Sequence, residues 1–188
     1  MLFELGLLFK HVVVSRPSRQ IKTPYVADLL PFADDLQHLV TKHTLALTST
    51  PSGGDGVLSP SKKDRVAAYA ALSTALRDTA PDAIVLGHTP ALDCAGMIVP
   101  GSTVLCTQNT GGTTKTAFAV QLCEEIREHD ERVTVGCHPF LAERAAKRLI
   151  ELALLPELGA YDVSAVASQV PVVSVGVVAK RYELMTPP

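Results

Sequence analysis

The sequence contains no tryptophan, and aromatic residues make up only 5% of its 188 positions. Proteins that bind single-stranded nucleic acid stack bases on aromatic rings, so this scarcity disfavours an extended base-stacking platform. No apolar run approaches the ~20 residues that cross a membrane, and we expect no membrane partner. The formal charge is −2, so the chain does not suit coating of nucleic acid by bulk charge. Any such contact needs a local basic patch.

The sequence also lacks Cys-x-x-Cys pairs, since its four cysteines are Cys94, Cys106, Cys123 and Cys137. This spacing favours reduced, buried thiols over a zinc site or a disulfide framework. His38 and His43 lie five residues apart and share no helix face well, which disfavours a metal site. We therefore expect no metal and no cofactor.

Apolar and turn-forming residues divide the chain into short elements. Strands are predicted over 5–15 and 23–32, joined by the basic turn 16–22 "RPSRQIK", and again over 82–88 and 132–137. Residues 96–108 "GMIVPGSTVLCTQ" predict a strand, a Pro-Gly turn and a second strand. Helical periodicity marks 62–78 and 139–155, whereas 48–62 is a loop rich in Ser, Thr, Gly and Pro. Residues 114–126 fit a strand or a helix equally well.

The segment 108–116, "QNTGGTTKT", has the general form of a phosphate-binding loop. Such a loop requires glycine directly before the lysine, because a side chain there obstructs the curl of backbone N–H groups around the phosphates. Thr114 occupies that position before Lys115, and Thr110 stands where a variant form of the loop has lysine. The sequence therefore favours a glycine turn over a nucleotide site, which stays the weaker alternative.

Four segments resemble, in order, the sugar fermentation stimulation protein (SfsA) family of nucleases. They are "GLLFKHVVVSRPSRQIKTPYVADL", "GHTPALDCAGMIVPGSTVLC", "TKTAFAVQLCEE" and "VGCHPFLAERAAKRLIELALLPELGAYD". The resemblance implies an α+β fold with an N-terminal OB-like β-barrel in residues 1–132, which includes a helical insertion at about 31–82. A linker helix and a truncated α/β domain of the restriction-endonuclease type then occupy 133–188.

Two departures from the family pattern bear on function. The insertion at 31–82 adds a surface that suits partner binding. The family's metal-dependent chemistry also needs an Asp on one strand and a Glu-x-Lys on the next. Asp162 precedes the corresponding strand, and no Glu-x-Lys follows it. The resemblance therefore implies a non-catalytic relative.

Arg16, Arg19 and Lys22 lie two or three residues apart on the predicted turn, a spacing that suits consecutive phosphates. A solvated basic turn is the alternative. Together with Lys115 they form the predicted nucleic-acid-binding set. His88, before Thr89-Pro90, is a turn histidine bonded to backbone, a residue that lines a groove or a catalytic residue.

The sequence thus predicts a structural or assembly subunit of a larger complex, with other protein subunits and RNA or DNA as partners. A ribonucleoprotein such as a mitochondrial ribosome fits best. The alternatives are a free-standing nucleic-acid-binding protein or a residual metal-dependent nuclease. The N-terminal segment reads either as an organellar targeting segment or as a strand, so a mitochondrial or a cytoplasmic location is expected.

Overall fold

The computed structural model describes residues 4–48, 61–90, 96–112, 114–126 and 132–155. Its six strands form one sheet in the order β3-β2-β1-β4-β5-β6, in which neighbouring strands are antiparallel. A further parallel pairing of β3 with β5 closes the first five strands into a barrel. The strands are β1 (Phe9–Ser15), β2 (Val26–Pro31), β3 (Val85–His88), β4 (Thr103–Gln108), β5 (Phe118–Ile126) and β6 (Arg132–Gly136).

The barrel interior is filled by side chains from alternate positions of the strands. Side chains of a strand alternate between its two faces, so β1 supplies Val13, β2 supplies Ala27 and Leu29, and β4 supplies Val104 and Cys106. Gly87 in β3 faces Leu29, whose Cδ1 atom occupies the space that a Cβ atom would need. Glycine at this position lets the Leu29 side chain pack directly against the backbone of β3.

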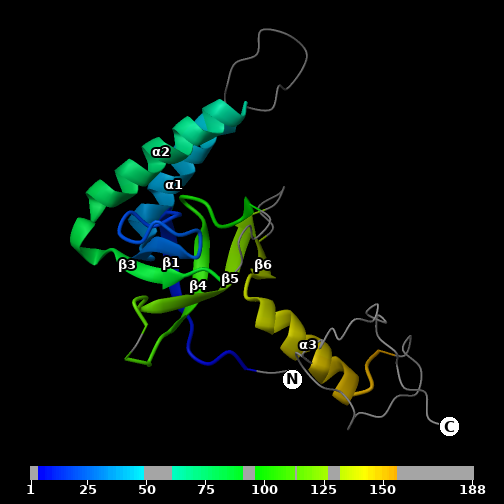
Figure 1. Ribbon diagram of the computed structural model, residues 1–188. Helices are drawn as coiled ribbons and strands as arrows, with labels where there is room; N and C mark the ends of the chain where they lie inside the picture. Colours follow the sequence, from blue (N-terminus) through cyan, green and yellow to red (C-terminus); the bar gives the residue numbers. More distant parts are fainter. Residues whose placement is uncertain (1–3, 49–60, 91–95, 113, 127–131, 156–188) are drawn as a thin grey trace, which may run out of the picture. The chain divides into compact units, whose positions relative to one another are not determined.

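The other face of β1 and β2 is covered by two helices, α1 (Asp34–Thr48) and α2 (Lys62–Thr79). Val12, Val14 and Leu30 form a second buried cluster with Leu36 of α1 and with Leu72 and Leu76 of α2. Figure 1 shows the two helices side by side over this part of the barrel. The insertion is thus packed onto the barrel by apolar contacts.

The start of α2 is fixed by its capping residues. The Ser61 hydroxyl accepts a hydrogen bond from the Asp64 N–H at 3.2 Å, and Oδ2 of Asp64 accepts one from the Ser61 N–H at 3.2 Å. This reciprocal arrangement satisfies backbone donors that the first turn of a helix leaves free. It explains why the helix begins directly after the predicted loop.

These elements confirm the expected α+β class with an OB-like, five-stranded barrel and a helical insertion. The strands predicted around 5–15, 23–32, 82–88 and 132–137 are present, and residues 118–126 are a strand rather than a helix. Within 31–82, however, α1 was not predicted. The helical periodicity of α1 is weak in the sequence, because its apolar stripe of Leu36, Leu39 and Val40 is short and is followed by a loop-like sequence.

The strand predicted over 96–99 is wrong. Gly101 adopts a φ of +91°, which an L side chain rarely tolerates, and a Cβ atom there would lie 2.7 Å from Cδ2 of Leu72. The Ser102 hydroxyl donates to the Met97 carbonyl at 2.6 Å and accepts from the Val99 N–H at 3.1 Å. These bonds hold the segment in an irregular conformation, so the Pro-Gly turn and β4 are the parts of the expected hairpin that are present.

Contacts divide the chain into a unit of residues 5–139 and a second unit that contains Glu4 and residues 140–155. The expected boundary lay after residue 132, but β6 pairs with β5 and continues the sheet of the barrel. The second unit contains most of α3 (Pro139–Glu151), in which Arg148 and Glu151 form an ion pair at 3.0 Å. Asp162 and the tail expected to be a nuclease remnant lie outside the described residues.

The packing of α2 on the barrel generates a stability prediction. Leu76 is fully buried, so Leu76→Ala should lower the free energy of unfolding by about 2–5 kcal/mol, through lost burial and a residual cavity. Val66, which lies on the same helix and is 59% exposed, provides the control, because Val66→Ala should change stability by less than about 0.5 kcal/mol. Urea unfolding measures both. Equal effects of the two substitutions would contradict the packing described above.

Candidate nucleic-acid interface

Two loops border β3, the four-residue strand at which the barrel closes. The β1–β2 loop (residues 16–25) meets its C-terminal end, where the Thr89 N–H donates to the Tyr25 carbonyl at 2.8 Å. The β4–β5 loop (residues 109–117) meets it three residues earlier, where the Ala117 N–H donates to the Leu86 carbonyl at 2.9 Å. At ~3.3 Å per strand residue, these attachment points lie roughly 10 Å apart along β3.

The β1–β2 loop is held in shape by its own hydrogen bonds. Ser18 is 1% exposed, and its hydroxyl accepts hydrogen bonds from the N–H groups of Gln20 and Ile21. Nε of Arg16 donates to the Pro24 carbonyl at 2.8 Å, which joins the two ends of the loop. Arg16 is consequently half-buried, whereas Arg19 and Lys22 are exposed. The loop therefore presents two cations to solvent on an ordered backbone.

The β4–β5 loop contains the glycine-rich segment that resembles a phosphate-binding loop. The Asn109 N–H donates to the Ala117 carbonyl at 2.9 Å, and the Asn109 side chain donates to the Thr116 carbonyl at 2.9 Å. The chain then continues as the strand β5, whereas a phosphate-binding loop of an ATPase leads into a helix. The interpretation of this segment as a phosphate-binding loop is therefore wrong. Lys115 is exposed on this hairpin loop.

The two loops carry positive charge only. Four of the 17 lysines and arginines lie in them, and all 19 acidic residues lie elsewhere. The structure thus places Arg16, Arg19 and Lys22 in the loop at one end of β3 and Lys115 in the loop attached at Leu86. Their role in binding stays a prediction, but the arrangement concentrates the field of four cations around one strand.

The acid closest in sequence to these cations is Asp28, which is 1% exposed and already paired. Its Oδ2 atom accepts hydrogen bonds from the Ser15 hydroxyl at 2.8 Å, the Arg19 N–H at 3.2 Å and Nη2 of Arg77 at 2.7 Å. Burial alone would raise the pKa of Asp28, but hydrogen bonds from Ser18, Arg77, Ser15 and the Arg19 backbone together hold its pKa below the ordinary value. The carboxylate is therefore charged at neutral pH and compensated by Arg77.

Sequence reasoning missed Tyr25 and the neighbourhood of His88. The Tyr25 side chain is 44% exposed at the end of the β1–β2 loop, and its position next to Pro24 in a cationic turn was the available signal. His88 ends β3 and is half-buried, so it is a strand residue rather than a turn residue. Burial lowers the pKa of His138, and the nearby charge of His88 lowers it further. The sequence could not indicate that His88 and His138 lie near each other, because they belong to segments that are distant in the chain.

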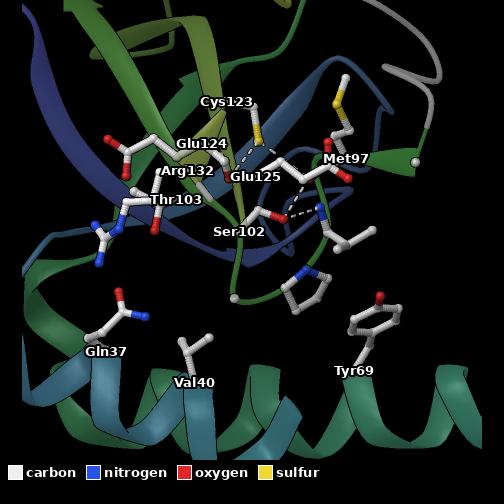
Figure 2. Close-up of a pocket in the computed structure, with 14 residues that line it drawn as sticks. Gln37, Val40, Tyr69, Met97, Ser102, Thr103, Cys123, Glu124, Glu125 and Arg132 are labelled. Atoms are coloured by element: carbon white, nitrogen blue, oxygen red, sulfur yellow. Dashed lines mark hydrogen bonds between the residues drawn. The ribbon is translucent and has the colours of Figure 1, made fainter. Parts of the chain in front are cut away.

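A separate cleft of about 340 Å³ lies between the helices and the start of β4 (Figure 2). Gln37, Val40 and Tyr69 line its helical side, and Glu124, Glu125 and Arg132 line the opposite side. Glu124 forms an ion pair with Lys10 at 2.8 Å. None of the four loop cations lines this cleft, and its carboxylates make it a poor site for phosphate groups.

Over the part of the chain that the structure describes, no group of three or more His, Cys, Asp or Glu side chains could hold a metal ion. The described helices include none that is long and apolar enough to cross a membrane.

No protein-family model matches the sequence, and no curated protein is significantly similar to it. A solved structure of Pyrococcus furiosus SfsA in complex with Ca²⁺ is similar at 17% sequence identity and a TM-score of 0.45. The similarity covers 84% of this chain and 42% of the SfsA chain, so this chain spans less than half the length of that protein. The likeness concerns the general fold alone, and membership of the family stays a prediction.

The buried charge of Asp28 predicts a pH-dependent stability. Its pKa is lower in the folded state than the ordinary 3.8, so the carboxylate stabilises the fold above pH 3.8 and ceases to do so as the pH falls through the folded-state pKa. Asp28→Asn should be less stable than the unmodified protein by about 1–3 kcal/mol at pH 6, because charge-assisted hydrogen bonds are lost. Urea unfolding should show this difference shrinking below pH 3.8. A difference that stays constant down to pH 2 would contradict the charge assignment.

Proposed function

We propose that the protein binds single-stranded nucleic acid along β3, with phosphate groups against the cations of the β1–β2 and β4–β5 loops. The observation that carries the proposal is the presence of four cations and no acid in the two loops that border this strand. OB-type barrels bind oligonucleotides through the corresponding strands and loops, but they host other functions as well. The charge distribution, rather than the fold, is therefore the support.

The charge and coverage of the rest of the protein limit the proposed nucleic-acid site to the region around β3. With 13 lysines and arginines against 19 acids outside the two loops, the rest of the chain is net negative and repels phosphate. Helices α1 and α2 cover the outer face of β1 and β2, which leaves β3 as the accessible part of the binding face of such barrels. Tyr25 adds one exposed ring on which a base of a single strand can stack.

A charge-removal experiment tests this proposal. Arg19→Ala/Lys22→Ala/Lys115→Ala should weaken binding of a fluorescent dT12 or U12 oligonucleotide about 100-fold at ~50 mM salt. It should also reduce the slope of log K against log[salt] by about 2, because each lost phosphate contact contributes about 0.7. Fluorescence anisotropy over a salt series measures both quantities.

The matched control is Lys62→Ala/Lys63→Ala/Arg65→Ala, which removes three exposed cations at the start of α2. When both proteins are measured at ~150 mM salt, this variant should bind the oligonucleotide with the same affinity as the unmodified protein. At that salt concentration, surface charges beyond about 8 Å are screened. Equal losses in the two triple variants, or no binding by the unmodified protein at low salt, would refute the proposed function.

We further propose that the protein acts as a subunit of a ribonucleoprotein complex. The support is the combination of a confined basic patch, a net charge of −2 and a helical insertion whose outward side exposes Val66. Such a molecule suits contact with nucleic acid on one side and with protein on another. The native protein should therefore sediment in a large particle on a density gradient, and ribonuclease treatment should release it. Sedimentation as a free monomer in untreated extract would count against this role.

A further inference from the structure

Asp28 lies at a junction of three segments of the barrel unit. Its Oδ2 atom accepts hydrogen bonds from the Ser15 hydroxyl at the end of β1, from the Arg19 N–H in the β1–β2 loop and from Nη2 of Arg77 in the last turn of α2. Nη2 of Arg77 also donates to the Ser15 hydroxyl at 3.2 Å. One carboxylate oxygen thus connects the basic loop to the helical insertion.

The Asp28–Arg77 pair lacks the geometry of the strongest carboxylate–guanidinium pairs. A two-pronged contact would use both carboxylate oxygens and two guanidinium nitrogens. Here Oδ1 of Asp28 and Nε of Arg77 are buried and have no hydrogen-bond partner among the described residues. Oδ2 instead receives the Arg19 N–H and the Ser15 hydroxyl as well as Arg77. The carboxylate of Asp28 therefore binds the backbone of the β1–β2 loop as well as its counter-ion Arg77.

Arg77 makes this arrangement possible. A carboxylate that is 1% exposed needs a compensating charge, and the only ion pair of Asp28 within the described residues is with Arg77 at 2.7 Å. Arg77 belongs to α2, which Leu72 and Leu76 fix on the barrel. The position of the loop backbone at Arg19 consequently depends on a residue of α2, Arg77, which is 49 residues from Asp28 in sequence.

We propose that Asp28 and Arg77 are positioning residues that hold the β1–β2 loop in the conformation in which Arg19 and Lys22 bind phosphate groups. The helical insertion then contributes to the binding site without touching the ligand. The hydrogen bonds that link α2 to the β1–β2 loop through Asp28 do not depend on the proposed function. Its consequence for binding rests on the proposed function.

The test uses Asp28→Ala/Arg77→Met, which removes both charges together and so leaves no unpaired buried ion. The matched control is Arg148→Met/Glu151→Ala, which removes the exposed ion pair of α3. Native-state hydrogen exchange by NMR reports on the loop, and anisotropy with dT12 or U12 over a salt series reports on binding. If the first variant does not fold, Arg77→Lys is used, because it retains the charge but lacks the planar guanidinium.

In the folded Asp28→Ala/Arg77→Met variant, the Arg19 amide should exchange at least tenfold faster than in the unmodified protein. Exchange of the Val104 amide in β4 should change only as much as the global stability changes. Oligonucleotide affinity should fall about tenfold, and the salt slope should decrease by about 1. The α3 control should change neither. A merely structural role would move both amides together and leave the salt slope unchanged.

The possible failures are distinguishable. An unchanged Arg19 amide in the folded variant would overturn the positioning role, whatever the binding result. A loosened loop with unchanged affinity and salt slope would overturn the link to the ligand. Absence of binding by the unmodified protein would overturn the proposed function together with that link, whereas the exchange measurement would still decide the positioning role.

Discussion

The parallel pairing of β3 with β5 is the constraint on which the arrangement of the candidate interface depends. Only Gly87 with Phe118 and His88 with Ala119 are paired, yet these two contacts convert an open sheet into a closed barrel. The closure brings the start of β5, and with it the β4–β5 loop, to the same strand that the β1–β2 loop meets. Without it, β3 would be an edge strand of an open sheet, separated from β5 by β2, β1 and β4.

The helical insertion determines which part of the barrel is available. It buries the outer side of β1 and β2 in an apolar cluster, so a ligand has access to β3 and its two loops rather than to a broad sheet face. The insertion also supplies Arg77, whose charge allows Asp28 to remain ionised inside the protein. Coverage of the barrel and ordering of the basic loop thus come from the same helix, and Figure 1 shows its position beside α1.

Local patterns in the sequence were sufficient for most strands, for α2 and for α3, because alternation, capping residues and turn residues act within a few positions. The basic turn and the glycine-rich hairpin were also predicted, since both depend on nearest neighbours. The sequence could not predict that these two loops border one strand, because this follows from a pairing between residues 87–88 and 118–119. Nor could it predict the Asp28–Arg77 pair, whose members are 49 residues apart in sequence. The α1 helix was missed because its apolar stripe is short and is interpreted only against its partners on β1 and α2.

The central claim, that nucleic acid binds along β3 between two basic loops, is tested most directly by NMR. Uniformly ¹⁵N-labelled protein is titrated with a short single-stranded oligonucleotide at low salt, and the shifts of backbone amides are followed. The account predicts that the largest changes fall within residues 16–25, 86–89 and 109–117. Changes concentrated on α2, or in the cleft lined by Glu124 and Glu125, would contradict it.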